Sequence, residues 1–135
     1  MASSDNVVRA GLTPKLKDVP TLTSMLTYSF APADEQKMKP SNFQNCCHST
    51  LYDPPIEEFS IVRTELKGGE IEEMGGISGP SILIVTAGGG KLSTPSGYLK
   101  TLNEGSIWFI AANEEISLKA AVDMVTYRAF AEVET

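Results

Sequence analysis

The sequence predicts a mostly β protein: an antiparallel jelly-roll barrel with an extended, short-helical appendage at its N-terminal end. The first observation is a series of short strand patterns in the last two thirds of the chain, spaced by about 8–12 residues. The second is that glycine and proline separate these patterns, as turns between strands require. The third is that the 135 residues are 41% hydrophobic, which is enough for one core and one domain of ordinary size.

Residues 1–30 form the first of three zones. Pro14 and Pro20 each disfavour helix at the preceding residue, so this zone is predicted to be mostly extended. A helix of two turns at most is expected after Asp18 or Thr21, because either residue can cap it and apolar residues follow at helical spacing. The apolar residues on one face of this helix are Leu22, Met25 and Leu26.

Residues 31–50 form the second zone, which we predict to be a surface linker. The zone contains four charges, two prolines and several amides, with little periodicity. It also contains both cysteines, Cys46 and Cys47, and the only histidine, His48.

Residues 51–135 form the third zone, the predicted barrel domain. A continuous apolar run between Ser81 and Thr86 is typical of a strand buried on both faces. The glycines at 88–90 are expected to form a tight turn after it, and Pro95-Ser96-Gly97 to turn a hairpin. The other expected strands are 56–66, the hairpin pair 91–94 and 98–102, 106–111, 115–119 and 124–131.

Composition excludes several classes of protein. Seventeen acidic against eleven basic residues give a net charge of −6, which argues against a nucleic-acid partner. No apolar run is long enough to span a membrane, so no membrane partner is expected, and the first 20 residues do not resemble a signal peptide. Adjacent cysteines cannot form an ordinary disulfide without strain, which points to the reducing cytoplasm.

Metal chemistry finds little support in the residues. Cupin barrels hold a metal between a His-x-His pair and a later histidine, whereas this chain has acidic residues at 70–73 and at Glu114 in those places. Cys46-Cys47-His48 lacks a fourth ligand, and a solvated loop histidine is the simpler interpretation of His48. We therefore expect no metal ligands in this chain.

Three acidic pairs are candidates for acid–base chemistry: Glu57-Glu58, Glu72-Glu73 and Glu114-Glu115. Neighbours on a strand point to opposite faces, so at most one member of each pair faces inward. A solvated outer face is the simpler interpretation of all three pairs.

Basic residues near the N-terminus are a stronger candidate site. Arg9 lies in a segment with Gly11 and Pro14 that has the composition of a shaped loop, and Lys15 and Lys17 follow it closely. A guanidinium and an ammonium that converge there could bind a phosphate or stabilise an enediolate. Exposed bases with no such role are the alternative.

The sequence around Arg9 resembles the signature of the eukaryotic-type (type I) mannose-6-phosphate isomerase family. Further segments resemble the C-terminal third of the same family in the same order, so the resemblance covers roughly residues 4–30 and 51–131. The segments that carry it are Ser4–Lys15, Asp18–Leu22, Leu51–Pro55, Ser81–Leu83, Phe109–Glu114 and Arg128–Phe130.

The resemblance implies a function and two site residues. The family interconverts mannose 6-phosphate and fructose 6-phosphate through an enediol with a zinc ion, and its active-site arginine and substrate-facing lysine match Arg9 and Lys15. Its zinc ligands lie upstream of this signature, so zinc is the family's cofactor and none is expected in this chain alone.

Two interpretations follow from the resemblance. The chain is an isomerase component that needs an N-terminal catalytic region or self-association, or it is a metal-free jelly-roll module that binds a sugar phosphate or a partner protein.

Overall fold

The computed structural model describes residues 7–9 and 11–132, and these separate into two compact units. The first unit ends at Lys37 and the second begins at Met38. No helix among the described residues has both the length and the apolar character needed to cross a membrane.

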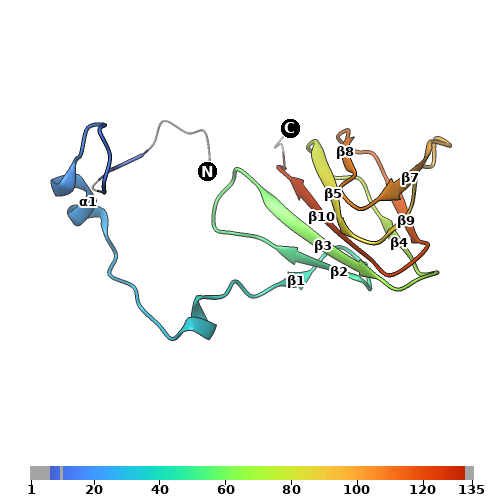
Figure 1. The fold of residues 1–135 in the computed structure, drawn as a ribbon, viewed down its shortest axis with the longest axis horizontal. Coiled ribbons are helices and arrows are strands. Elements are labelled where there is room, and N and C mark those ends of the chain that lie inside the picture. Colours follow the sequence, from blue (N-terminus) through green and yellow to red (C-terminus); the bar gives the residue numbers. More distant parts are fainter. Residues whose placement is uncertain (1–6, 10, 133–135) are drawn as a thin grey trace. The chain divides into compact units, whose positions relative to one another are not determined.

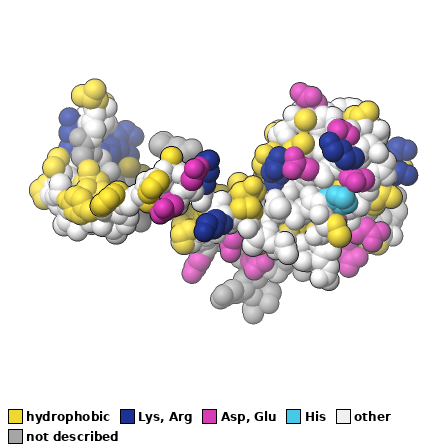
Figure 2. All heavy atoms as spheres, turned by 90° about the horizontal axis from the view of Figure 1, so that it is seen from below, with side chains coloured by type: hydrophobic (Ala, Val, Ile, Leu, Met, Phe, Trp, Pro, Cys, Tyr) yellow, Lys and Arg dark blue, Asp and Glu magenta, His cyan; other side chains and the backbone are white. Residues whose placement is uncertain are grey.

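The N-terminal unit contains one short α-helix, α1 (Val19–Met25), and one 3-10 turn, η1 (Ala33–Gln36). Asp18 caps α1, because its carboxylate accepts hydrogen bonds from the backbone N–H and the hydroxyl of Thr21. The predicted short helix and its cap are therefore confirmed. None of the described residues of this unit is buried, and hydrophobic side chains gather on its surface (Figure 2).

The second unit is an antiparallel sandwich of two sheets (Figure 1). The six-stranded sheet has the order β1-β2-β3-β10-β5-β8, and the four-stranded sheet has the order β4-β9-β6-β7. Strands that are distant in sequence pair at the centre of both sheets, as in a jelly roll, so the predicted mostly β, antiparallel jelly-roll class is confirmed.

The strands within residues 60–66 and 81–130 lie close to the positions that the sequence patterns predicted, whereas those at 41–42, 49–52 and 71–74 were not expected. The strand bounds are β1 (Ser41–Asn42), β2 (Ser49–Tyr52), β3 (Ser60–Leu66), β4 (Ile71–Met74), β5 (Ser81–Ala87), β6 (Gly89–Ser93), β7 (Leu99–Asn103), β8 (Ile107–Ile110), β9 (Ile116–Ala120) and β10 (Met124–Phe130). The hairpin between β6 and β7 turns at Gly97, whose φ of 90° suits glycine. At Gly88, between β5 and β6, a Cβ would lie 1.8 Å from the Asp123 carbonyl oxygen, so only glycine fits there. Gly89 and Gly90 belong to β6, so the prediction of a tight turn at 88–90 is wrong.

The structure differs from the sequence prediction in residues 38–50, which we expected to be surface linker. β1 and the first two residues of β2 lie in this stretch, and β2 pairs with β3. Phe43 is 5% exposed and its ring contacts that of Phe130. This stretch has little periodicity of its own. It becomes part of the barrel because the Phe43 ring is buried and because β2 pairs with β3.

The core lies between the two sheets and uses one face of each strand. Fifteen buried hydrophobic side chains form one cluster, with Leu51, Cys46 and Trp108 packed against it. The continuous apolar run of β5 was predicted to be buried on both faces, and this prediction is wrong for the structure. Leu83 and Val85 are fully buried, whereas Ile82 and Ile84 are 53% and 36% exposed.

Candidate functional site

The loop between Arg9 and Asp18 carries both site residues that the sequence analysis selected. Its ends meet because the Asp18 backbone N–H donates to the Arg9 carbonyl oxygen at 2.9 Å. Within it, the Lys15 N–H donates to the Thr13 hydroxyl oxygen at 3.2 Å. The two hydrogen bonds from Thr21 lower the pKa of Asp18, so this carboxylate stays charged at the base of the loop.

The two cations therefore lie on one closed loop, but no contact joins them. Arg9 is half-buried and Lys15 is exposed. The four ion pairs found among the described residues include neither side chain. The loop offers two cations for an anionic ligand, and the described residues of the N-terminal unit form no core behind them.

Glu72 is the only acidic side chain that is buried within the described barrel, at 5% exposure. Its carboxylate accepts hydrogen bonds from the backbone N–H groups of Cys47 and His48, at 3.2 and 2.6 Å, and from the Ser49 hydroxyl at 3.2 Å. The Ser49 hydroxyl in turn lies 2.8 Å from that of Thr64. The interpretation of the Glu72-Glu73 pair as a solvated outer face is thus wrong for Glu72.

Through these hydrogen bonds the Glu72 carboxylate of β4 connects the smaller sheet to the start of β2 in the larger sheet. Three donors converge on its two oxygens, so the role that its surroundings support is structural rather than acid–base. Alternation along the strand allows one inward carboxylate, but only the tertiary fold shows that Glu72 is inward and Glu73 outward.

The Cys46-Cys47-His48 segment contacts residues 70–73. The Cys46 thiol lies 3.5 Å from the Glu73 carbonyl oxygen, and burial raises its pKa. The His48 Nδ1 lies 3.5 Å from a Glu70 carboxylate oxygen. Among residues 7–9 and 11–132, no three His, Cys, Asp or Glu side chains group in a way that could hold a metal ion.

Arg128 is a second buried charge that the sequence analysis did not single out. It lies on the inward face of β10 and is 1% exposed. Its Nε donates to the Ser81 hydroxyl at 2.9 Å, whereas Nη1 and Nη2 have no hydrogen-bond partner among the described residues. Burial lowers the pKa of Arg128 to about 10, so the guanidinium is still charged at neutral pH.

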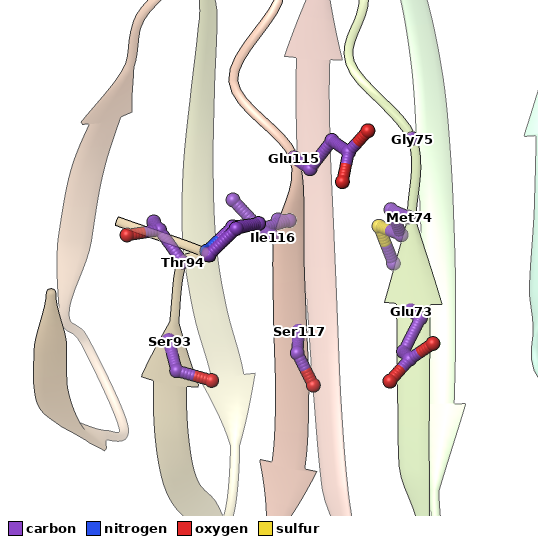
Figure 3. A pocket seen from close by; sticks show the side chains of 9 residues that line it. Glu73, Met74, Gly75, Ser93, Thr94, Glu115, Ile116 and Ser117 are labelled. Carbon is purple, nitrogen blue, oxygen red and sulfur yellow. The ribbon is translucent and has the colours of Figure 1, made fainter. Parts of the chain in front are cut away.

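A shallow groove of about 510 Å³ lies on the smaller sheet (Figure 3). Glu73, Ser117 and Ser93 form a row across it, because Ser117 of β9 pairs with both neighbours. Glu115 lies above this row in Figure 3, beside Gly75. The polar groups that line the groove are carboxylates and hydroxyls without a cation, so it suits neutral hydroxyl groups better than a phosphate.

Comparisons with known proteins find similarity to mannose-6-phosphate isomerases. The family described as "Phosphomannose isomerase type I C-terminal" matches residues 49–95. A mannose-6-phosphate isomerase from Aspergillus fumigatus is 47% identical over 98% of this chain, and one from Schizosaccharomyces pombe is 45% identical over 98%. The alignments cover 32% and 33% of these relatives, so the chain spans about a third of their length.

The solved structures similar to this chain include a mannose 6-phosphate isomerase. Mannose 6-phosphate isomerase from Salmonella typhimurium, bound to its substrate and a zinc atom, aligns with 98% of this chain and 32% of its own. The TM-score is 0.75 and the identity 25%. Ectoine synthase from P. lautus, with a TM-score of 0.53 and 16% identity over 65% of this chain and 67% of its own, shares the fold alone.

Proposed function

We propose that this chain, which corresponds in sequence to the C-terminal third of mannose-6-phosphate isomerases, contributes the arginine loop and the terminal barrel to that reaction. The substrate class is a hexose 6-phosphate, and the reaction is the interconversion of mannose 6-phosphate and fructose 6-phosphate. The observation that carries the proposal is identity of 47% and 45% to two such enzymes over 98% of the chain.

Arg9 is the residue to which we assign the chemical role. Moving a proton between C1 and C2 of the sugar creates negative charge on oxygen in the enediol intermediate. A guanidinium stays charged at all working pH values and offers a planar fork of donors, which suits it to stabilise that charge. Residues 1–30 are then the edge of the catalytic region.

Lys15 is assigned a binding role. It lies on the same closed loop as Arg9, and its ammonium is a mobile point charge on an exposed side chain. Such a cation can attract and hold the anionic substrate without taking part in proton transfer.

The chain needs further polypeptide to perform this chemistry. No described residue of the N-terminal unit is buried, so the described part of that unit has no core to hold the Arg9 side chain in one position. Zinc is bound in the Salmonella relative, but the described residues offer no group of three ligands for it. We derive no catalytic step through zinc, and we assign metal binding to the polypeptide that forms the other two thirds of such enzymes.

The cytoplasm is the compartment in which we expect this activity. The sequence carries two adjacent cysteines, between which a disulfide would be strained, and this pattern suits a reducing compartment.

A chimera tests the proposal, in which this chain replaces the matching third of the Aspergillus fumigatus enzyme. We expect the chimera to turn over mannose 6-phosphate in a coupled assay. Arg9→Ala should lower kcat by about 10²–10³ with a small change in KM, because charge stabilisation matters most in the transition state. Arg9→Lys should restore little of it, since a point charge does not replace the fork.

Lys17→Ala is the matched control, because Lys17 is an exposed base on the same loop with no assigned role. Its kcat should stay within about twofold of the chimera. A similar value for Arg9→Ala would refute the catalytic assignment.

A metal-free binding module is the second candidate, and the exposed apolar side chains of β5 favour its partner-protein form. Calorimetry of the chain alone with mannose 6-phosphate in the presence of a chelator tests the other form of the module, which binds a sugar phosphate. Tight binding by the chain alone, combined with an inactive chimera, would favour the module.

A further inference from the structure

The outer faces of the two sheets differ sharply in character. The smaller sheet presents mostly charged and hydroxyl side chains to solvent, among them Glu73, Lys91, Thr101 and Lys119, and its exposed apolar side chains among the described residues, Ile71 and Leu99, lie apart on the edge strands β4 and β7. The larger sheet presents isoleucines and aromatic rings instead. A sandwich that is solvated on both sides would have polar outer faces on both sheets.

Strand register shows that the exposed apolar side chains of the larger sheet are contiguous. Paired residues of neighbouring antiparallel strands point to the same face, so two adjacent rows can be followed across the sheet. One row is Tyr52, Ile61, Ala129, Ile82 and Phe109, and the next includes Arg63, Tyr127, Ile84 and Ile107. We call the eight of these residues other than the charged Arg63 the apolar face.

The apolar face is most exposed at its β8 end. Phe109 is 71% exposed, Ile107 65% and Ile82 53%. Two hollows on the apolar face can receive side chains of a partner. The first, of about 240 Å³, includes Ile82, Phe109 and Phe59 in its lining; the second, of about 420 Å³, lies between Tyr52, Ile61, Arg63 and Tyr127.

The free edge of β8 is further evidence that this surface is covered by other polypeptide. Among the described strands β8 pairs only with β5, so its other edge offers backbone groups that no described strand pairs. Residues 107–112 contain no charge and no proline, which are the usual protections of a free edge strand. The continuous apolar run of β5 likewise has the composition of a strand that is covered on both faces.

We infer that the apolar face is a docking surface for the polypeptide that forms the other two thirds of mannose-6-phosphate isomerases. The inference rests on the proposed function and specifies its partner. Relatives carry about twice as much additional chain as is present here, since 98% of this chain aligns with about a third of theirs. The same polypeptide accounts for the exposed apolar side chains of the N-terminal unit, such as Leu12 and Phe30.

Chains with an altered apolar face test this inference. The double variant Ile107→Lys/Phe109→Lys is made both in the chain alone and in the chimera with the Aspergillus fumigatus enzyme. Thr101→Lys is the matched control, because Thr101 is an exposed residue of β7, the edge strand of the smaller sheet. The readouts are thermal unfolding and light scattering, with isomerase turnover measured separately.

We expect the double variant to leave the melting temperature of the chain alone within about 1 °C, because both side chains are already exposed. In the chimera it should lower the melting temperature by about 5 °C or more, or split one transition into two. Thr101→Lys places a lysine opposite Lys91, so it should lower the melting temperature slightly and by the same amount in both proteins.

The outcomes separate this inference from the proposed function. An active, Arg9-dependent chimera that the double variant does not destabilise would overturn the docking inference alone. An inactive chimera that the double variant still destabilises would support docking and refute the function. A chain that dimerises alone through the apolar face, with the chimera unaffected, would assign the surface to a second copy and overturn the inference.

Discussion

Replacing Arg128 by methionine should make the chain more stable. Arg128 is 1% exposed, and within residues 7–9 and 11–132 its guanidinium has one hydrogen-bond partner, the Ser81 hydroxyl at Nε. Its two terminal nitrogens are buried without a partner among the described residues. Replacing a poorly compensated buried charge by an apolar side chain of similar length is often neutral or stabilising.

The lowered pKa gives the magnitude. Lowering the pKa of Arg128 from its ordinary value to about 10 corresponds to about 3 kcal/mol of stability lost through burial of the charge. Arg128→Met removes this cost but leaves the Ser81 hydroxyl without its partner, which costs about 1 kcal/mol. We therefore expect the free energy of unfolding to rise by about 1–2 kcal/mol.

The pH dependence has a definite sign. The pKa of Arg128 is lower in the folded chain than in the unfolded chain, so burial of its charge destabilises the fold at every pH below about 10. As pH rises above 10, the folded chain loses the proton first and this cost declines. The advantage of the methionine variant should therefore shrink above pH 10.

Denaturation in urea, followed by the fluorescence of Trp108, measures the effect. Trp108 is the only tryptophan, and it pairs with Leu83, which in turn pairs with Arg128. Arg63→Met on the outward face of the neighbouring strand β3 is the matched control and should stay within about 0.5 kcal/mol. A methionine variant that is less stable than the parent by more than about 1 kcal/mol would refute this account of Arg128.

Three further outcomes are expected. Glu72→Gln should lower the free energy of unfolding, measured in urea, by about 1–3 kcal/mol, because an amide cannot accept all three hydrogen bonds. Glu73→Gln on the outward face is its control and should change that free energy little. Asp18→Ala should reduce the helicity of α1 by circular dichroism. The pKa of Asp18 is lower in the folded than in the unfolded chain, so its stabilisation is complete above the unfolded pKa and is lost as pH falls from there through the folded pKa. The chain alone should show no turnover and no stoichiometric zinc by elemental analysis; one zinc per chain with chelator-sensitive turnover would contradict this.

Local signals in the sequence were sufficient for several elements. Asp18 before a helical spacing of apolar residues predicted α1, and glycine and proline at 95–97 predicted the hairpin of β6 and β7. These signals act between residues close in sequence, where capping and turn geometry are decided. The resemblance around Arg9 and Lys15 likewise depends on local sequence, although their roles remain proposals.

The tertiary structure alone decided which faces are covered. Alternation on β10 separates Arg128 and Thr126 from Tyr127, but it does not say which set meets the other sheet. Glu72 is buried because distant N–H groups at 47 and 48 converge on it, and Phe43 because Phe130 lies beside it. The apolar run of β5 predicted cover on both faces, whereas this fold covers one. Pairing between distant strands sets these environments, and no window of the sequence contains both partners.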